Sequence, residues 1–144
     1  MPATRAQQTA AMATDLTALT HDQMPFTGDL GLRIEHGSAD EVVGTADWQA
    51  NRCTAGGILH GGYLMALADS VGGLCAFHNL PPGAITSTIE SKTNFFRGVS
   101  DGSVSIVSTP LHVGRTTIVV QTDITRADGK PVTRTTQTQA VIQP

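Results

Sequence analysis

Aromatic and charged residues are both scarce in this sequence. Aromatic side chains make up 4% of the 144 residues and charged ones 15%, with a net charge of −3 at pH 7. A nucleic-acid-binding surface needs clustered Lys and Arg, so this balance argues against nucleic acid as a partner. No stretch is long and apolar enough to span a membrane. The N-terminal region has no continuous apolar segment, so we expect no signal peptide.

Cysteine occurs only twice, as Cys53 and Cys75. Two cysteines do not form a disulfide framework, and we expect free thiols in a reducing, cytoplasmic location. The five histidines show no metal-ligand spacing. We therefore expect neither a metal site nor another cofactor.

The chain length fits one domain. We expect an N-terminal segment over residues 1–24, with a short helix at 6–19 that ends before Pro25. The remaining residues, 25–144, are predicted to form one packed domain.

The most informative stretch is residues 56–79, GGILHGGYLMALADSVGGLCAFHN. Apolar residues recur there at spacings of three and four, which predicts a helix. The helix is apolar nearly all round, so we expect it to be buried. Its single acid, Asp69, then needs a hydrogen-bond partner or a shifted pKa, because a buried unpaired carboxylate is costly.

Strand patterns lie on both sides of this helix. Residues 28–48 read as two strands, the first with Leu30, Leu32 and Ile34 alternating. Four strand-like runs follow the helix, at 84–96, 103–113, 116–126 and 130–142. Short connections favour antiparallel neighbours. We therefore expect an α+β fold in which an antiparallel sheet wraps around one long central helix.

Three of these strands carry a local signal of their own. In the run 84–96, Ile85, Ile89 and Thr93 are separated by even numbers of residues and so lie on one face of a regular strand. This predicts a single buried face towards the helix. The parity changes midway through 103–113, which predicts a bulge. Asp128-Gly129 predicts a tight hairpin turn.

The string GGILHGGYLMALAD, residues 56–69, resembles the signature of hotdog-fold acyl-CoA thioesterases, in particular the PaaI-like and 4-hydroxybenzoyl-CoA thioesterase branch. The resemblance extends over residues 24–142 and includes TNFFR at 93–97. Three positions depart from the family pattern: Thr54 replaces Asn or Gln, Gly98 replaces Pro, and Gly73 replaces the Thr of some relatives.

The resemblance implies hydrolysis of acyl-CoA thioesters, with aryl or short-to-medium acyl groups, in a homodimer that often pairs into a tetramer. Coenzyme A is then part of the substrate rather than a cofactor. On this basis the substrate-contacting candidates are His60, Gly61, Thr54, Ser70, Thr93, Asn94 and Arg97.

The chemistry also follows from the residues themselves. Thioester hydrolysis needs a donor for the developing oxyanion and a carboxylate that attacks or activates water. A helix N-terminus near Gly62 supplies backbone N–H groups, and Asp69 supplies the carboxylate as nucleophile or general base. The two lie on one helix face but about 10.5 Å apart along its axis. Two antiparallel copies of the helix would bring Gly62 of one chain to Asp69 of the other, which predicts a dimer with shared sites.

Several candidates keep two interpretations. His60 lies about 180° round the helix from Asp69, so it is either an orienting residue at the start of the helix or a substrate contact. Ser70 either bonds back into its own helix or lines the site. Thr93 is either a packed strand residue or a contact to the pantetheine arm. Arg97 is either solvated or, with Arg115 or Arg126, a ligand for coenzyme A phosphates.

The sequence is also compatible with two other functions. A hotdog hydratase or dehydratase would pair a histidine with an acid in one pocket. A non-catalytic acyl-CoA-binding dimer would have no activity that depends on Asp69.

Overall fold

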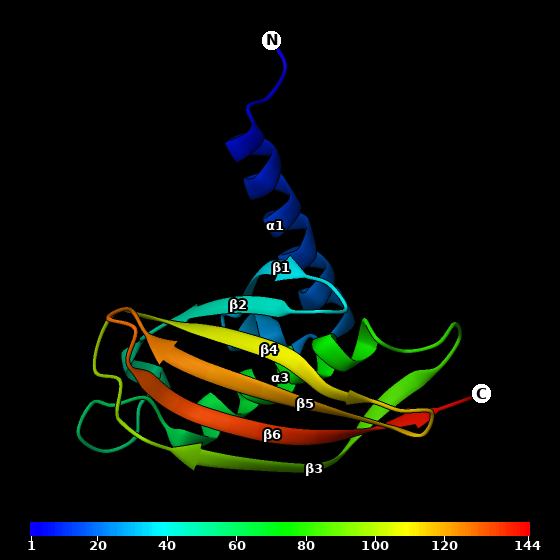
Figure 1. Ribbon diagram of the computed structural model, residues 1–144. Helices are drawn as coiled ribbons and strands as arrows, with labels where there is room; N and C mark the ends of the chain where they lie inside the picture. Colours follow the sequence, from blue (N-terminus) through cyan, green and yellow to red (C-terminus); the bar gives the residue numbers. More distant parts are fainter.

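The computed structural model describes the backbone of residues 1–144 and the side chains of residues 1–8 and 15–144. Six antiparallel strands form one sheet in the order β1-β2-β4-β5-β6-β3. The sheet curves around the central helix α3, Gly61–Phe77, which lies against its concave face (Figure 1). The predicted α+β architecture, an antiparallel sheet wrapped around one long helix, is confirmed.

Helix α1, Arg5–Gln23, is longer than predicted and projects from the sheet at its N-terminal end (Figure 1). Thr4 and Gln7 form a capping box at its start. Near its other end, the Thr17 hydroxyl accepts from the Ile34 N–H at 2.8 Å, and a His21 ring nitrogen lies 2.6 Å from the Leu32 carbonyl oxygen. The second half of α1 is therefore fastened to the start of the sheet. The expected boundary at residue 24 stays a prediction.

The first strand is shorter than the alternation of Leu30, Leu32 and Ile34 predicted. A short helix, α2 (Phe26–Asp29), precedes it, and β1 begins only at Arg33. Gly31 adopts a positive φ of 66°, which breaks the extended backbone between Leu30 and Leu32. Both leucines are nevertheless buried, because the turn directs them into the core.

The remaining strands are β2 (Val42–Asp47), β3 (Ile85–Phe95), β4 (Ser103–Val113), β5 (Thr117–Arg126) and β6 (Pro131–Ile142). The strands β4, β5 and β6 follow one another as hairpins, and β3 pairs with β6 at the sheet edge. The predicted bulge in β4 is confirmed, with a register shift between Pro110 and His112. The Asp128-Gly129 turn is also present, with Gly129 at a φ of 81°.

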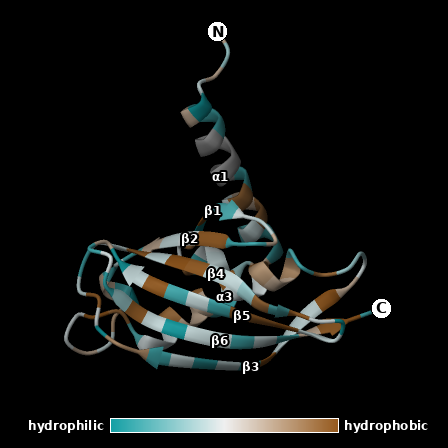
Figure 2. Ribbon diagram, in the orientation of Figure 1, coloured by the Kyte–Doolittle hydropathy of each residue, from teal (hydrophilic) through white to brown (hydrophobic). Residues whose placement is uncertain are grey.

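The core lies between α3 and the concave face of the sheet. Strands alternate between apolar and polar residues along their length (Figure 2), as expected for a sheet with one covered face. The fully buried aliphatic side chains of the core include Leu32, Leu67, Val71, Ile106, Ile118, Val120 and Ile124. Of these, Ile118, Val120 and Ile124 form the predicted inner face of β5.

The prediction of one buried face along β3 is wrong. A register shift between Thr88 and Glu90 interrupts the pairing with β6 and exchanges the two faces of the strand. Thr86 and Thr88 therefore face α3 before the bulge, and Thr93 faces it afterwards. Ile85 and Ile89 are 62% and 63% exposed in the single chain.

In the described part of the chain, no helix combines the length and apolar character needed to cross a membrane.

Candidate active site

The N-terminus of α3 is held by a loop that starts after the 3-10 turn Ala50–Arg52. Cys53 and Leu59 form an isolated antiparallel bridge, and the intervening Gly56 and Gly57 both adopt positive φ values. The His60 N–H donates to the Arg52 carbonyl at 2.9 Å. These bonds fix the direction in which α3 begins.

His60 is the N-cap of α3. Its Nδ1 accepts a hydrogen bond from the Gly62 N–H at 2.8 Å, which requires a neutral ring protonated on Nε2. This bond is the orienting role predicted from the sequence. It also occupies the N–H of Gly62, the residue at which we expected the oxyanion donor.

Because the Gly62 N–H is occupied, the candidate oxyanion donor is the N–H of Gly61, the first residue of the helix. Within the described residues, the Gly61 N–H donates to no other group of the chain. A Cβ at Gly61 would lie 3.3 Å from the Phe95 ring, so glycine lets this ring pack against the helix start. Gly62 is exposed, but its N–H already donates to His60 Nδ1.

Asp69 is exposed in the single chain, so the prediction that it lies on a buried face is wrong. The helix buries only the face directed at the sheet, and Met65, one turn before Asp69, is also 40% exposed. Two side chains from the sheet hold the carboxylate. The Thr88 hydroxyl donates to Oδ1 at 3.1 Å, and Gln137 Nε2 donates to the same oxygen.

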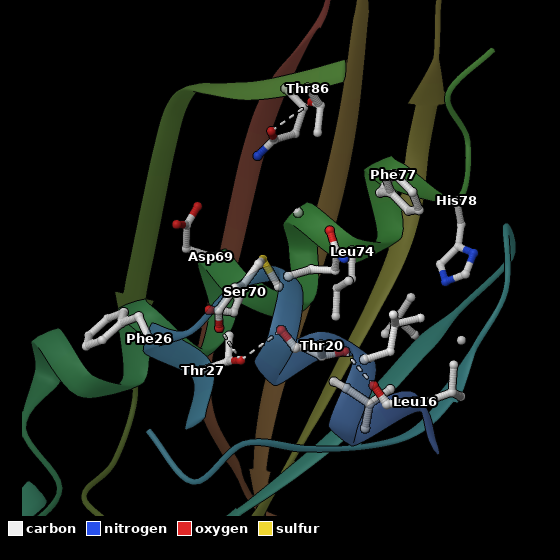
Figure 3. Close-up of a pocket in the computed structure, with 18 of the residues that line it drawn as sticks. Leu16, Thr20, Phe26, Thr27, Asp69, Ser70, Leu74, Phe77, His78 and Thr86 are labelled. Carbon is white, nitrogen blue, oxygen red and sulfur yellow. Dashed lines mark hydrogen bonds between the residues drawn. The ribbon is translucent and has the colours of Figure 1, made fainter. Parts of the chain in front are cut away.

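A cavity of about 640 Å³ lies beside Asp69, between α1, α2 and α3 (Figure 3). Asp69, Ser70 and Thr88 form the part of its polar wall nearest the acid. Its other polar lining residues are Thr20, Gln23, Thr27, His78, Thr86, Ser87 and Gln139. Its apolar lining consists of Leu16, Leu19, Met24, Phe26, Ile34, Val42, Leu74 and Phe77. Ligand pockets are commonly of this size and character, with a few polar groups on an apolar surface.

The cavity contains Asp69 but none of the residues at the helix start, His60, Gly61 and Gly62. The geometry of a straight helix separates the donor and the acid by about 10–12 Å. A single chain therefore does not bring the predicted donor and carboxylate together.

The other predicted residues are distributed unevenly. Ser70 lines the cavity and donates back to the Ala66 carbonyl at 2.8 Å. Thr93 shares a hydrogen bond of 2.8 Å with Thr135 on the inner face. Asn94 accepts from Lys92 at 2.8 Å on the outer face, away from α3.

Thr54 and Arg97 lie near the loop that precedes α3. Thr54 is exposed, and its N–H donates to the Ile58 carbonyl at 2.9 Å. Arg97 follows β3 and donates to the Pro131 carbonyl. Neither residue lines the cavity beside Asp69.

The Cys75 thiol is not suited to nucleophilic catalysis. Burial raises the pKa of the Cys75 thiol to about 11, so this thiol stays protonated at neutral pH. Among the residues with described side chains, no three His, Cys, Asp or Glu are grouped so that they could hold a metal ion.

Sequence patterns missed the residues that hold Asp69 and those that close the cavity. Thr88 and Gln137 are 19 and 68 positions from Asp69. The one available signal was the pair Gln137 and Gln139 at inward-facing positions of β6, where an apolar residue is usual. The cavity-lining residues of α1 lay in the segment that we had placed outside the domain.

A curved antiparallel sheet around one central helix is the hotdog fold. The chain belongs to the thioesterase superfamily, whose family model matches residues 56–133. This confirms the resemblance found in residues 56–69.

Individual relatives agree with this assignment. The Pseudomonas aeruginosa protein PA1618 is 30% identical over 130 residues, which cover 89% of this chain and 90% of the relative. The 1,4-dihydroxy-2-naphthoyl-CoA hydrolase of Escherichia coli is 28% identical over 117 residues, covering 81% of this chain and 86% of the relative.

Solved structures show the same fold. The thioesterase HI1161 of Haemophilus influenzae matches with a TM-score of 0.84 and 27% identity, covering 91% of this chain and 90% of its own. A hypothetical thioesterase of Streptococcus pneumoniae, solved with coenzyme A, matches with a TM-score of 0.71 and 30% identity, covering 78% of this chain and 88% of its own.

Proposed function

We propose that this protein hydrolyses acyl-CoA thioesters to a free acid and coenzyme A, in sites shared by the two chains of a homodimer. The observation that carries the proposal is the position of Asp69, a solvent-accessible carboxylate at the polar wall of an apolar cavity. Membership of the thioesterase superfamily supports thioester hydrolysis, and the coenzyme A held by the S. pneumoniae relative supports the acyl-CoA form of the substrate.

In the proposed mechanism, the thioester carbonyl oxygen accepts from the Gly61 N–H of one chain. This donor stabilises the negative charge that develops on the oxygen, and the helix dipole adds to it. Asp69 of the other chain either attacks the carbonyl carbon or removes a proton from an attacking water. The C–S bond then breaks, and coenzyme A leaves as a thiolate that takes up a proton. If Asp69 is the nucleophile, a water then hydrolyses the acyl–Asp69 anhydride, which releases the free acid and restores the carboxylate; if Asp69 is the base, the attacking water yields the free acid directly.

Coenzyme A also needs a site for its phosphates. Arg126 is already ion-paired with Asp128, whereas Arg97 comes two residues after Phe95, whose ring packs against Gly61. We therefore assign the phosphates to Arg97 rather than to Arg126, and Arg115 remains the second candidate.

The structure offers less support for the two other functions. A dehydratase would need a histidine and an acid that act on one substrate, but His60 Nδ1 accepts from Gly62 and His60 lies outside the cavity beside Asp69. His78 does line this cavity, but it comes nine residues after Asp69 at the end of α3, about 13.5 Å further along the helix axis. A binding protein without catalysis would not need a carboxylate with one oxygen free at the cavity.

The proposed function is tested by following thiol release from a panel of acetyl-, hexanoyl-, benzoyl-, phenylacetyl- and palmitoyl-CoA. We expect the wild-type protein to hydrolyse the aryl or medium-chain members fastest, because the cavity is apolar and of moderate volume. A protein that releases no thiol from any member would contradict the proposal.

Gly73 offers a sharper test of the acyl pocket. It lines the cavity one turn after Asp69, and a Cβ there would meet no atom within 4 Å. Gly73→Leu should therefore fill the cavity and lower kcat/KM for benzoyl- and hexanoyl-CoA by about tenfold or more, while acetyl-CoA is much less affected.

The fold should survive this change, because Leu is a better helix former than Gly by about 0.8 kcal/mol. Gly73→Ala is the matched control, since it makes the same helix change with little added volume. An equal loss of activity for every acyl group would mean that Gly73 does not face the acyl chain.

A further inference from the structure

We propose that Gln137 is a positioning residue for Asp69, a role that rests on the proposed function. It holds one carboxylate oxygen of Asp69 so that the other faces the cavity. Gln137 belongs to β6 and reaches Asp69 across the space between the sheet and α3.

The hydrogen bonds around Asp69 all converge on one atom. Gln137 Nε2 and the Thr88 hydroxyl both donate to Asp69 Oδ1. Gln139 Nε2 in turn donates to the Thr88 oxygen at 2.7 Å, which orients that hydroxyl. Within the described residues, Oδ2 receives no hydrogen bond, so it is the oxygen left for substrate or water.

Gln137 occupies a position that disfavours it. Its side chain is 1% exposed, and its Oε1 is buried without any hydrogen-bond partner. A buried unpaired polar atom costs stability, and such groups in native proteins call for a functional explanation.

The helix also makes room for this side chain. A Cβ at Gly72 would lie only 2.2 Å from Gln137 Oε1, so any other residue at 72 would displace the amide. Glycine inside a helix is itself unfavourable. The chain therefore carries two unfavourable features, Gly72 and the unpaired oxygen, at the one place where a sheet residue reaches Asp69.

The test is Gln137→Met, which keeps the length of the side chain but removes both the donor and the unpaired oxygen. We expect kcat to fall roughly ten- to a hundredfold with KM within about twofold, because the reacting carboxylate is misplaced while the pocket is intact. We expect Tm to stay the same or rise. A purely structural role for Gln137 would instead lower Tm.

Gln121→Met is the matched control, since the Gln121 side chain donates to Asp123 on the outer face of β5, away from Asp69. It should leave kcat unchanged. Gly72→Ala provides a second route to the same effect, because it displaces the Gln137 amide without altering any hydrogen-bonding side chain.

A double-mutant cycle tests whether Gln137 acts through Asp69. If Gln137 acts through Asp69, then Gln137→Met should cost no further activity in an Asp69→Asn background. The proposal is overturned if Gln137→Met keeps wild-type kcat, or if its effect is unchanged in that background. If instead the wild-type protein hydrolyses no acyl-CoA, the proposed function itself fails, and this role of Gln137 fails with it.

Discussion

Replacing Asp69 by Asn is expected to lower kcat for the best acyl-CoA at least about a hundredfold, which corresponds to about 2.7 kcal/mol of activation free energy. Asn has the same shape but can neither attack the thioester nor accept a proton from water at neutral pH. Thiol release from wild-type and variant protein, compared under identical conditions, measures the effect.

The fold should be retained, because the Asn oxygen can still accept from Thr88 and Gln137. Asp40→Asn is the matched control, since Asp40 is exposed in the turn between β1 and β2. If Asn at position 69 supported wild-type hydrolysis, the carboxylate would not carry the chemistry, and a binding role would become the better account.

Replacing Gly61 by Pro is expected to lower kcat by roughly a hundred- to a thousandfold, the usual effect of losing one oxyanion donor. Proline removes the backbone N–H and is well tolerated at the first position of a helix. His60 has a φ of −61° and a ψ of 134°, which is the extended conformation that a residue before proline adopts.

Gly61→Ala separates the donor from the added volume. Alanine places the same Cβ against the Phe95 ring but keeps the N–H. We expect Gly61→Ala to retain far more activity than Gly61→Pro, with circular dichroism confirming that both proteins are folded. Equal losses in the two variants would mean that steric contact with Phe95, rather than the missing N–H, is responsible.

The central helix and strands β4 and β5 could be predicted because their patterns report local physics. The spacing of Leu64, Leu67 and Val71 matches the helical repeat, and Ile118, Val120 and Ile124 alternate along a strand without interruption. The turn at Asp128-Gly129 depends only on the preference of glycine for a positive φ. Such features need no knowledge of the rest of the chain.

The errors arose where a bulge or a turn, which the alternating pattern does not mark, changed the course of a strand. The bulge after Thr88 moved Ile85 to the face opposite Thr93, and nothing in the residues themselves marks its position. The positive φ of Gly31 gave two buried leucines without a strand.

The residues of the candidate site also fall into those marked by a local motif and those brought in by long-range packing. Asp69 and the glycines at the helix start could be identified because their motif is contiguous in sequence. Gln137 could not, because its contact with Asp69 spans 68 residues and depends on how β6 packs beneath α3. The prediction that Asp69 is buried failed because a single chain covers only the sheet-facing side of this apolar helix. In our proposal, a second chain covers the other side.

The most direct test of the account is to combine two inactive variants in one dimer. Asp69→Asn and Gly61→Pro each damage a different half of the shared site, so a mixed dimer has one intact site and one with both changes. Co-refolding equal amounts of the two proteins should restore about a quarter of wild-type thiol release, since half of the dimers are mixed and each has one working site. Activity that stays at the level of the separate variants, in mixtures shown to contain the mixed dimer, would contradict a site built from Gly61 of one chain and Asp69 of the other.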